Sequence, residues 1–226
     1  MLITIKHVLT PEQVQDCRQA LFSAEWEDGK KTAGYLAQHV KANLQLPLTS
    51  PVGLQVGQFL LHILQNNPTY IAAALPAKIL PPRFNCYQGG GTYGNHIDNA
   101  IFPIAGTEAR LRTDVSSTLF LSDADEYEGG ELVIEDTYGT QSIKLNAGDM
   151  VVYPGTSLHR VNPVTAGTRL ASFFWAQSMV RQAHRRRMLW DLDQSIQAIA
   201  ATNSQHPQLA VLSGVYHNLL REWAEL

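Results

Sequence analysis

A glycine-rich segment that ends in a histidine and an aspartate occupies residues 85–98 and reads Asn85-Cys86-Tyr87-Gln88-Gly89-Gly90-Gly91-Thr92-Tyr93-Gly94-Asn95-His96-Ile97-Asp98. On a β-strand, residues two apart project to the same face. The spacing therefore predicts that His96 and Asp98 present an imidazole and a carboxylate to one point, with Ile97 on the opposite face. This pair is the beginning of a candidate metal site that needs a further ligand from elsewhere in the chain.

His159 is the best candidate for that third ligand. It follows Gly148-Asp149 and Pro154-Gly155, and the residues between predict a strand and a turn that can present it at the mouth of a barrel. Two histidines and one carboxylate are the ligand set of the facial triad of non-haem Fe(II) oxygenases, which leaves coordination positions open. We expect those positions to take a bidentate co-substrate and O2.

Arg169 is the fourth member of the candidate site. It lies ten residues after His159, beyond the turn Pro163-Val164-Thr165-Ala166-Gly167, so we expect it on the next strand of the sheet that carries His159. A guanidinium matches a carboxylate with two parallel hydrogen bonds, and 2-oxoglutarate bound to iron through its oxo-acid end would offer one. Alternation along the strand places Phe173 and Trp175 on the same face as Arg169, where aromatic rings would keep the pocket dry.

Segments with strand character follow one another from residue 79 to residue 176, separated by clusters of Gly, Asp and Pro. They are Ile79–Tyr87, Tyr93–Asp98, Val115–Leu121, Glu131–Glu135, Gln141–Leu145, Asp149–Tyr153, His159–Val161 and Arg169–Ala176. Residues 99–114 and 122–128 are expected to be loops. The spacing of the strands is typical of an antiparallel sandwich or jelly roll.

The regions on either side of these strands have helical patterns. Residues 1–75 predict a short strand followed by helices, one starting at the capping box Thr10-Pro11-Glu12-Gln13 and one at Ser50-Pro51. After residue 178, apolar residues recur at helical spacing on both sides of a break at 203–207, which predicts a helical hairpin. Its first helix carries a basic run that we expect to form a solvated face: Arg181, Arg185, Arg186 and Arg187.

Composition restricts the class of protein. The 226 residues are 45% hydrophobic and 16% charged with a formal net charge of −3, which predicts a globular chain without a field that would attract nucleic acid or anionic membranes. Cys17 and Cys86 lie in no CxxC motif, so neither a disulfide framework nor a zinc ribbon is expected. The N-terminus lacks the pattern of a signal peptide and no apolar run is long enough to span a bilayer, so we expect a cytoplasmic protein.

The order of these motifs resembles that of a known family. Tyr87, the triad residues and Arg169, together with Glu128-Gly129-Gly130-Glu131-Leu132, are similar to the Fe(II)/2-oxoglutarate-dependent dioxygenases of the prolyl and lysyl hydroxylase type. The whole chain, including the C-terminal helical hairpin, resembles the bacterial PKHD-type hydroxylases most closely. The oxygenase motifs span roughly residues 80–178.

The resemblance implies an α+β fold with a double-stranded β-helix (jelly-roll) core, N-terminal helices packed on it and a C-terminal helical hairpin. The implied segments are residues 1–77, 78–178 and 179–226. Implied too are iron at His96, Asp98 and His159, 2-oxoglutarate at Arg169, and L-ascorbate as a reductant. The activity would be hydroxylation of an amino-acid side chain or small molecule, in a context linked to iron uptake, with a homo-oligomer possible through the C-terminal helices.

One position departs from the related hydroxylases. They often carry Tyr-Leu-Asn where this chain has Phe120-Leu121-Ser122, and phenylalanine donates no hydrogen bond to a co-substrate. Ser117 or Tyr153 could supply that contact, but Tyr87 is the residue we expect. Two other functions remain open from the residues alone: a cupin-like metal-dependent isomerase, and a jelly roll that binds a ligand without catalysis.

Overall fold

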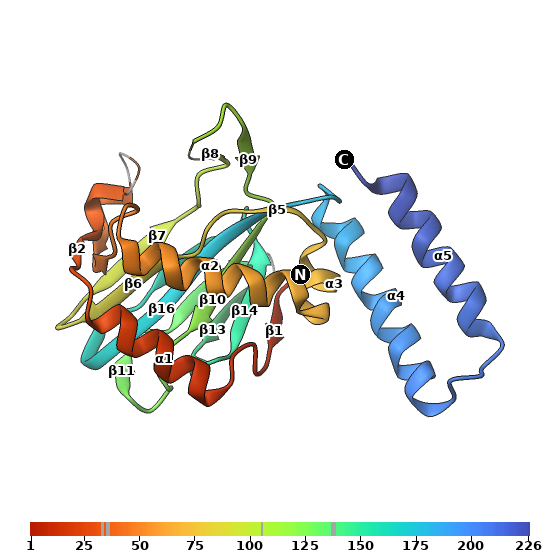
Figure 1. The fold of residues 1–226 in the computed structure, drawn as a ribbon, viewed down its shortest axis with the longest axis horizontal. Coiled ribbons are helices and arrows are strands. Elements are labelled where there is room, and N and C mark those ends of the chain that lie inside the picture. The colour runs from red at the N-terminus through yellow and green to blue at the C-terminus, as the bar shows by residue number, and fades with distance from the viewer. Residues whose placement is uncertain (33, 35–36, 105, 137–138) are drawn as a thin grey trace.

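Two antiparallel sheets face each other in the computed structural model, which describes all residues except 33, 35–36, 105 and 137–138. Helices cover the outer face of the larger sheet, and a helical hairpin projects from one end of the molecule (Figure 1). This is the predicted jelly roll with its helical additions. Among the described residues, no helix is long and apolar enough to cross a membrane.

The larger sheet supplies most of the framework. Its strands run in the order β1-β14-β10-β16-β6-β4-β2, and β11 and β5 also pair with β16. Their bounds are β1 Ile3–Ile5, β2 Glu27–Asp28, β4 Leu44–Gln45, β5 Pro76–Ile79, β6 Arg83–Gln88, β10 Val115–Phe120, β11 Tyr127–Gly129, β14 Met150–Pro154 and β16 Val164–Ser178. The long central strand β16 therefore contacts both halves of the sheet.

The smaller sheet has the order β13-β12-β15-β7-β3, and a separate two-stranded ribbon pairs β8 with β9. The bounds are β3 Lys41–Ala42, β7 Thr92–His96, β8 Ile101–Pro103, β9 Arg110–Arg112, β12 Leu132–Asp136, β13 Gly139–Ile143 and β15 Leu158–Val161. The ribbon stands out from the end of the sandwich (Figure 1).

Alternation along the strands of the larger sheet produces two cores. On one face, Val115 and Leu119 of β10 pack in a core shared with the helices. On the other face, Phe120 packs in a second core between the two sheets, together with Tyr87 of β6 and Val151 of β14. The space between the sheets is thus lined by side chains of one parity from each strand, as expected for a sandwich.

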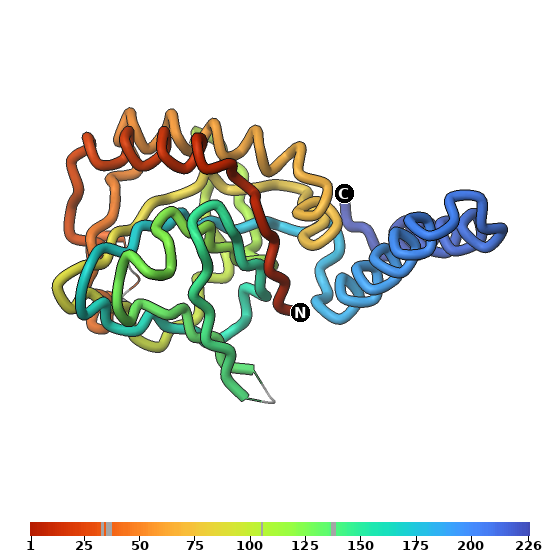
Figure 2. The backbone as a smooth tube through the Cα atoms, turned by 90° about the horizontal axis from the view of Figure 1, so that it is seen from below, coloured from red at the N-terminus to blue at the C-terminus, as the bar shows by residue number. Residues whose placement is uncertain are grey.

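The N-terminal helices begin where their capping residues predict. Helix α1 (Pro11–Phe22) has the capping box formed by Thr10 and Gln13, and α2 (Pro51–Asn66) is capped by Ser50. A short helix that the sequence reading missed, α3 (Pro68–Ala74), follows α2 directly. Figure 2 shows α1 and α2 side by side over one face of the molecule, where their apolar sides close the helix-side core.

Several predicted boundaries were wrong. The predicted strand 79–87 is two strands, β5 and β6, because Pro81 and Pro82 interrupt it and proline cannot donate to a sheet ladder. Residues 99–114, expected to be a loop, contain the β8–β9 ribbon. The stretch between α1 and α2, expected to be helical, contains β2, β3, β4 and the short 3-10 helices Gly29–Thr32 and Ala37–His39.

The C-terminal hairpin consists of α4 (Ala183–Thr202) and α5 (Gln208–Trp223). The two helices pack mainly on each other and extend away from the sheets (Figure 2). No residue of α5, which the structure describes throughout, is fully buried. The base of the hairpin reaches the rest of the protein through a small apolar cluster that includes Leu75, Val180 and Leu189, and through Trp190, which packs against the helix-side core.

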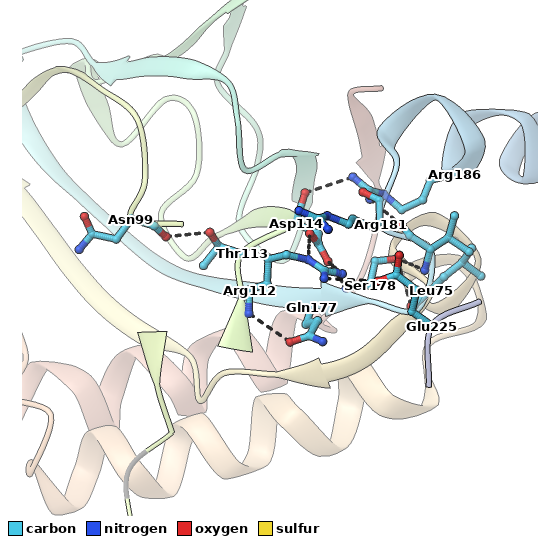
Figure 3. Close-up of polar contacts among 11 residues, drawn as sticks. Leu75, Asn99, Arg112, Thr113, Asp114, Gln177, Ser178, Arg181, Arg186 and Glu225 are labelled. Atoms are coloured by element: carbon cyan, nitrogen blue, oxygen red, sulfur yellow. Dashed lines mark hydrogen bonds and ion pairs between the residues drawn. The ribbon is translucent and has the colours of Figure 1, made fainter. Parts of the chain in front are cut away.

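Arg186 attaches that base to the larger sheet. The residue is 3% exposed, and its guanidinium donates hydrogen bonds to the carbonyl oxygens of Val180, Arg181 and Asp114 at 2.8, 2.8 and 3.1 Å (Figure 3). The carboxylate of Asp114 in turn accepts the backbone N–H of Ser178 at the end of β16. The expectation that Arg186 belongs to a solvated basic face is therefore wrong, because backbone carbonyls, in place of water, accept the hydrogen bonds of its guanidinium.

Replacing Arg186 by Ala should lower the free energy of unfolding by about 3 kcal/mol, because three buried or partly buried carbonyls lose a charged donor. The matched control is Arg187→Ala, which removes the same side chain from an exposed i,i+4 pair with Asp191. That control should change stability by no more than about 0.5 kcal/mol. Urea unfolding followed by circular dichroism measures both, and equal losses would contradict the role given to Arg186.

Candidate metal centre and co-substrate pocket

His96, Asp98 and His159 meet at one point between the two sheets. One ligand atom from each lies within 4.8 Å of the others. His96 ends β7 and is the register partner of His159 on β15, so the two imidazoles lie side by side with ring centroids 4.2 Å apart. The sequence correctly predicted that these three residues meet.

Asp98 reaches this point by a different route from the one predicted. Strand β7 ends at His96, so Asp98 lies two residues beyond the strand and not on its alternating face. Both of its carboxylate oxygens face the imidazoles, with Oδ1 3.9 Å from Nε2 of His96 and Oδ2 3.9 Å from Nε2 of His159. Two atoms bound to one ion at about 2.1 Å can be at most about 4.2 Å apart, so a single ion can bridge each of these pairs.

Backbone carbonyls hold both imidazoles in the form that binds a metal. Nδ1 of His96 lies 2.8 Å from the Gly94 oxygen, and Nδ1 of His159 lies 3.0 Å from the Ser157 oxygen. A carbonyl only accepts hydrogen bonds, so Nδ1 carries the proton and Nε2 keeps its lone pair toward Asp98. Such an outer contact is the usual companion of a metal-binding histidine.

The larger sheet positions the carboxylate. The Ser116 hydroxyl from β10 and the Trp175 indole N–H from β16 both donate to Oδ2 of Asp98 at 2.8 Å. Two donors on one oxygen hold the carboxylate in place, so its orientation toward the two imidazoles is fixed.

Burial and a neighbouring ring favour the neutral form of the His96 imidazole. Burial, and then the proximity of His159, lowers the pKa of His96 to about 4. The Tyr93 ring stacks on His96 with centroids 3.6 Å apart, and the Tyr153 ring meets His159 edge-on at 5.3 Å. Neutral imidazole is the form that coordinates a metal, so the donor set fits a divalent ion such as Fe(II).

Arg169 lies deep in the same pocket with unused hydrogen-bond donors. It is 1% exposed, and its Nε and Nη1 atoms have no hydrogen-bond partner among the described residues. Its guanidinium lies 5.3 Å from the Tyr87 ring centre and 5.1 Å from that of Phe120. A buried cation with free donors is costly unless an anion pairs with it, so the site fits a ligand carboxylate.

Gly130 leaves the room that the Arg169 side chain needs. A Cβ atom at Gly130 would lie 3.1 Å from Cδ of Arg169 and 2.8 Å from a methyl group of Val164, and its φ is +68°. A side chain at this position would therefore be strained and would push against the arginine. This is a physical reason for a glycine within the motif Glu128-Gly129-Gly130-Glu131-Leu132.

The three candidate hydroxyls around Arg169 are placed differently. Tyr87 and Tyr153 are buried and line the pocket, and the Tyr87 hydroxyl accepts a hydrogen bond from Asn85 at 3.3 Å. Burial raises the pKa of Tyr87 to about 12, so its hydroxyl stays protonated. Ser117 also lines the pocket, but it shares the strand face of Leu119 in the helix-side core, and its hydroxyl lies beside Tyr70.

The pocket holds residues that the sequence reading did not single out. Its lining includes Lys41 from β3 and Arg83 from β6, in addition to Ser116, which holds Asp98. Arg83 shares the strand parity of Tyr87, so alternation along β6 could have identified it. No comparable signal was available for Lys41, because its strand has only two residues and lies in a stretch expected to be helical.

Comparisons with known proteins agree with this geometry. The 2OG-Fe(II) oxygenase superfamily matches residues 82–177, and the PKHD-type hydroxylase C-terminal domain matches residues 184–225. A PKHD-type hydroxylase of Delftia acidovorans is 59% identical over 225 residues, covering 100% of both chains.

Solved structures support the fold. A prolyl-4-hydroxylase of Pseudomonas putida aligns with a TM-score of 0.51 at 19% identity, covering 78% of this chain and 92% of that one. A prolyl hydroxylase from Trichoplax adhaerens, solved with a peptide fragment of hypoxia inducible factor, aligns with a TM-score of 0.54 at 13% identity, covering 83% and 86%. The jelly-roll core is thus the one found in 2-oxoglutarate oxygenases.

Replacing Trp175 by Phe should weaken Fe(II) binding about 10-fold, because Asp98 loses one of its two anchoring hydrogen bonds while Ser116 keeps the other. Anaerobic calorimetric titration with Fe(II) measures the dissociation constant. Trp190→Phe is the matched control, since Trp190 packs against the helix-side core and should leave the constant unchanged. An unchanged constant in the Trp175 variant would contradict the anchoring role.

Proposed function

The chain belongs to the PKHD-type hydroxylases and is an Fe(II)- and 2-oxoglutarate-dependent dioxygenase, and from this premise we propose which of its residues carry the reaction. The reaction hydroxylates a substrate that is not yet identified. The alternatives of a cupin-like isomerase and a jelly roll without catalysis do not agree with this membership. The meeting of two imidazoles and one carboxylate within 4.8 Å is the observation that carries the residue assignment.

His96, Asp98 and His159 are the proposed iron ligands. Three ligands on one side of an octahedral ion leave three positions for the chelating end of 2-oxoglutarate and for O2. The chemistry that bound iron supplies is the activation of O2, which converts 2-oxoglutarate to succinate and CO2 and hydroxylates the substrate. The carbonyls of Gly94 and Ser157 support this assignment, because they leave each Nε2 free to coordinate.

Arg169 is the proposed partner of the distal carboxylate of 2-oxoglutarate. Its Nε and Nη1 have no partner among the described residues, so the guanidinium has N–H donors available for a carboxylate, and the surrounding rings exclude water from the pair. Tyr87 is the proposed second contact, through a hydroxyl that burial keeps protonated and able to donate. These residues bind and orient the co-substrate, and none of them needs to act as a general base.

The three predicted segments have distinct proposed roles. Residues 78–178 form the catalytic jelly roll, residues 1–77 support it, and residues 179–226 form a separate helical unit. Support for this division comes from the pairing of β1 and β4 with strands of the larger sheet, and from the projecting hairpin.

We also propose a reductant, a compartment and a mode of association between copies of the chain. Ascorbate is the proposed reductant that keeps the iron ferrous. The proposed compartment is the cytoplasm, which suits the buried and unpaired Cys17 and Cys86. Association of copies through the C-terminal helices is supported by apolar side chains that are about half exposed: Met188 51%, Val211 57% and Val215 45%.

Replacing Asp98 by Ala should abolish Fe(II) binding and succinate formation, because two neutral imidazoles alone hold a divalent ion weakly. Calorimetric titration and a succinate assay give the two readouts. Asp125→Ala, in the exposed acidic turn before β11, is the matched control and should behave as the wild type. Unchanged iron affinity in the Asp98 variant would remove Asp98 from the ligand set.

Replacing Arg169 by Leu should raise the KM for 2-oxoglutarate about 100-fold while iron stays bound, because the co-substrate loses two charge-assisted hydrogen bonds. Arg169→Lys keeps the charge without the planar fork and should recover part of the loss. Succinate formation at increasing 2-oxoglutarate concentration gives the KM. A normal KM in the Leu variant would show that another group binds the carboxylate.

A further inference from the structure

The pocket around the proposed metal ligands contains more positive charge than iron ligation and 2-oxoglutarate binding account for. Its described lining includes three cationic side chains, those of Lys41, Arg83 and Arg169, and one carboxylate, that of Asp98. The two charges of Fe(II) and the two of 2-oxoglutarate cancel, so the loaded pocket would keep two positive charges. Arg169 is matched to the co-substrate, which leaves Lys41 and Arg83 without an assigned anion.

Arg83 has a fixed position and free hydrogen-bond donors. Its guanidinium lies 4.9 Å from the Phe102 ring centre and 5.1 Å from that of Trp175. It forms no hydrogen bond or ion pair with any residue that the structure describes. Aromatic rings hold a guanidinium by its face and leave its N–H edge available. Arg83 is therefore positioned by stacking and has its donors available for a ligand.

The stacking places Arg83 next to the metal centre. The Trp175 indole that contacts Arg83 also donates its N–H to Asp98. Phe102, the other ring that contacts Arg83, belongs to β8 of the projecting ribbon. It packs with Trp175 at a centroid distance of 4.6 Å. One tryptophan thus connects the guanidinium to a proposed iron ligand, so a group bound by Arg83 would lie close to the reacting centre.

Lys41 lies beside another proposed ligand. It is 5% exposed, and its Nζ lies 5.1 Å from the centre of the Tyr93 ring, which stacks on His96. Nζ donates to Gln45 Oε1 at 2.8 Å and to Thr32 Oγ1 at 3.2 Å, and both acceptors are neutral. An ammonium has three N–H donors, so one remains for a ligand. No described carboxylate forms an ion pair with Lys41.

The two cations repel each other in the absence of an anion. Burial lowers the pKa of Lys41 to about 8, and the positive charge of Arg83 contributes to that shift, while the carboxylates of Asp28 and Asp98 oppose it only in part. Burial also lowers the pKa of Arg83. An anion bound between them would relieve the repulsion and replace the lost hydration. Burying two cations without a paired anion lowers the stability of the fold. Their presence is therefore better explained by a bound anionic ligand than by a structural role.

We propose that Arg83 and Lys41 together bind a carboxylate of the prime substrate, so that the substrates of this enzyme are carboxylic acids held through that group beside the iron. This inference rests on the proposed function of the site. The aromatic rings of Phe102 and Trp175 would contact the part of the substrate next to its carboxylate. The role of the two cations is to position the substrate, and the hydroxylation itself is performed at the metal.

The first test compares carboxylates with their neutral amides as probes. Benzoate is paired with benzamide and phenylacetate with phenylacetamide, on anaerobic enzyme saturated with Fe(II) and 2-oxoglutarate so that Arg169 and the metal are occupied. Calorimetric titration should show that the wild type binds each carboxylate at least about 10-fold more tightly than its amide. Arg83→Gln should abolish this preference, and Arg83→Lys should keep part of it.

Arg160→Gln is the matched control. Arg160 lies next to His159 on β15 but pairs with Glu135 outside the pocket lining, so its loss changes the nearby charge without touching the proposed anion site. The carboxylate preference should survive in this variant. Loss of the preference in both glutamine variants would overturn the inference, because it would show a general field effect and no specific site.

The remaining outcomes separate this inference from the proposed function. A wild type that binds Fe(II) and 2-oxoglutarate but shows no carboxylate preference, even at millimolar probe, overturns the inference alone. A raised KM for 2-oxoglutarate in Arg83→Gln also overturns it, since Arg83 would then bind the co-substrate. A wild type that binds neither Fe(II) nor 2-oxoglutarate overturns the proposed function and this inference with it.

A second measurement uses natural metabolites. A bacterial metabolite extract is separated on an anion-exchange column, and each fraction is incubated with the complete enzyme. Succinate formation and a product heavier by one oxygen should appear with the retained, anionic fraction, and Arg83→Gln should lower both about 10-fold. Stimulation by the unretained fraction alone would overturn the inference.

Discussion

The carboxylate of Asp98 connects the two sheets through hydrogen bonds. It follows a strand of the smaller sheet, yet its anchoring donors, Ser116 and Trp175, belong to the larger sheet. Its charge faces two imidazoles of the smaller sheet. The separation of the sheets, the direction of Trp175 and the position of the candidate ligands therefore depend on one another.

The short-range patterns of the sequence predicted which side chains form the candidate site better than they predicted the path of the backbone. His96 and His159 lie on strands, as the spacing predicted. Arg169 lies on the strand that follows His159 in the chain, but this strand, β16, belongs to the larger sheet and not, as expected, to the sheet of His159. Asp98 meets the site from outside its strand, and Pro81 with Pro82 divides a predicted strand. Local hydrophobicity carries little information on where a ladder ends, since the partner strand decides it.

The features that the sequence could not predict depend on contacts between distant segments. Lys41 enters the pocket from a two-residue strand that exists only because β7 pairs with it. Arg186 stands in a run of arginines that is typical of a solvated helix, and only the approach of Val180 and Asp114 makes it a buried donor. Lys41 is brought to the pocket by the pairing of β3 with β7, and Arg186 is buried against the carbonyl oxygen of Asp114, which is distant in the chain. No periodicity reveals either contact.

The register of β16 decides the position of Arg169 and of Trp175 together. Arg169 and Trp175 are three strand repeats apart on one face, and Leu170 and Phe174 occupy the opposite, helix-side face. A slip of one residue against β10 would exchange these faces along the whole strand. A misregistered chain would lose both the proposed partner of the co-substrate, Arg169, and the anchor of the Asp98 carboxylate, Trp175. Such defective molecules would be inert and would not consume 2-oxoglutarate without product.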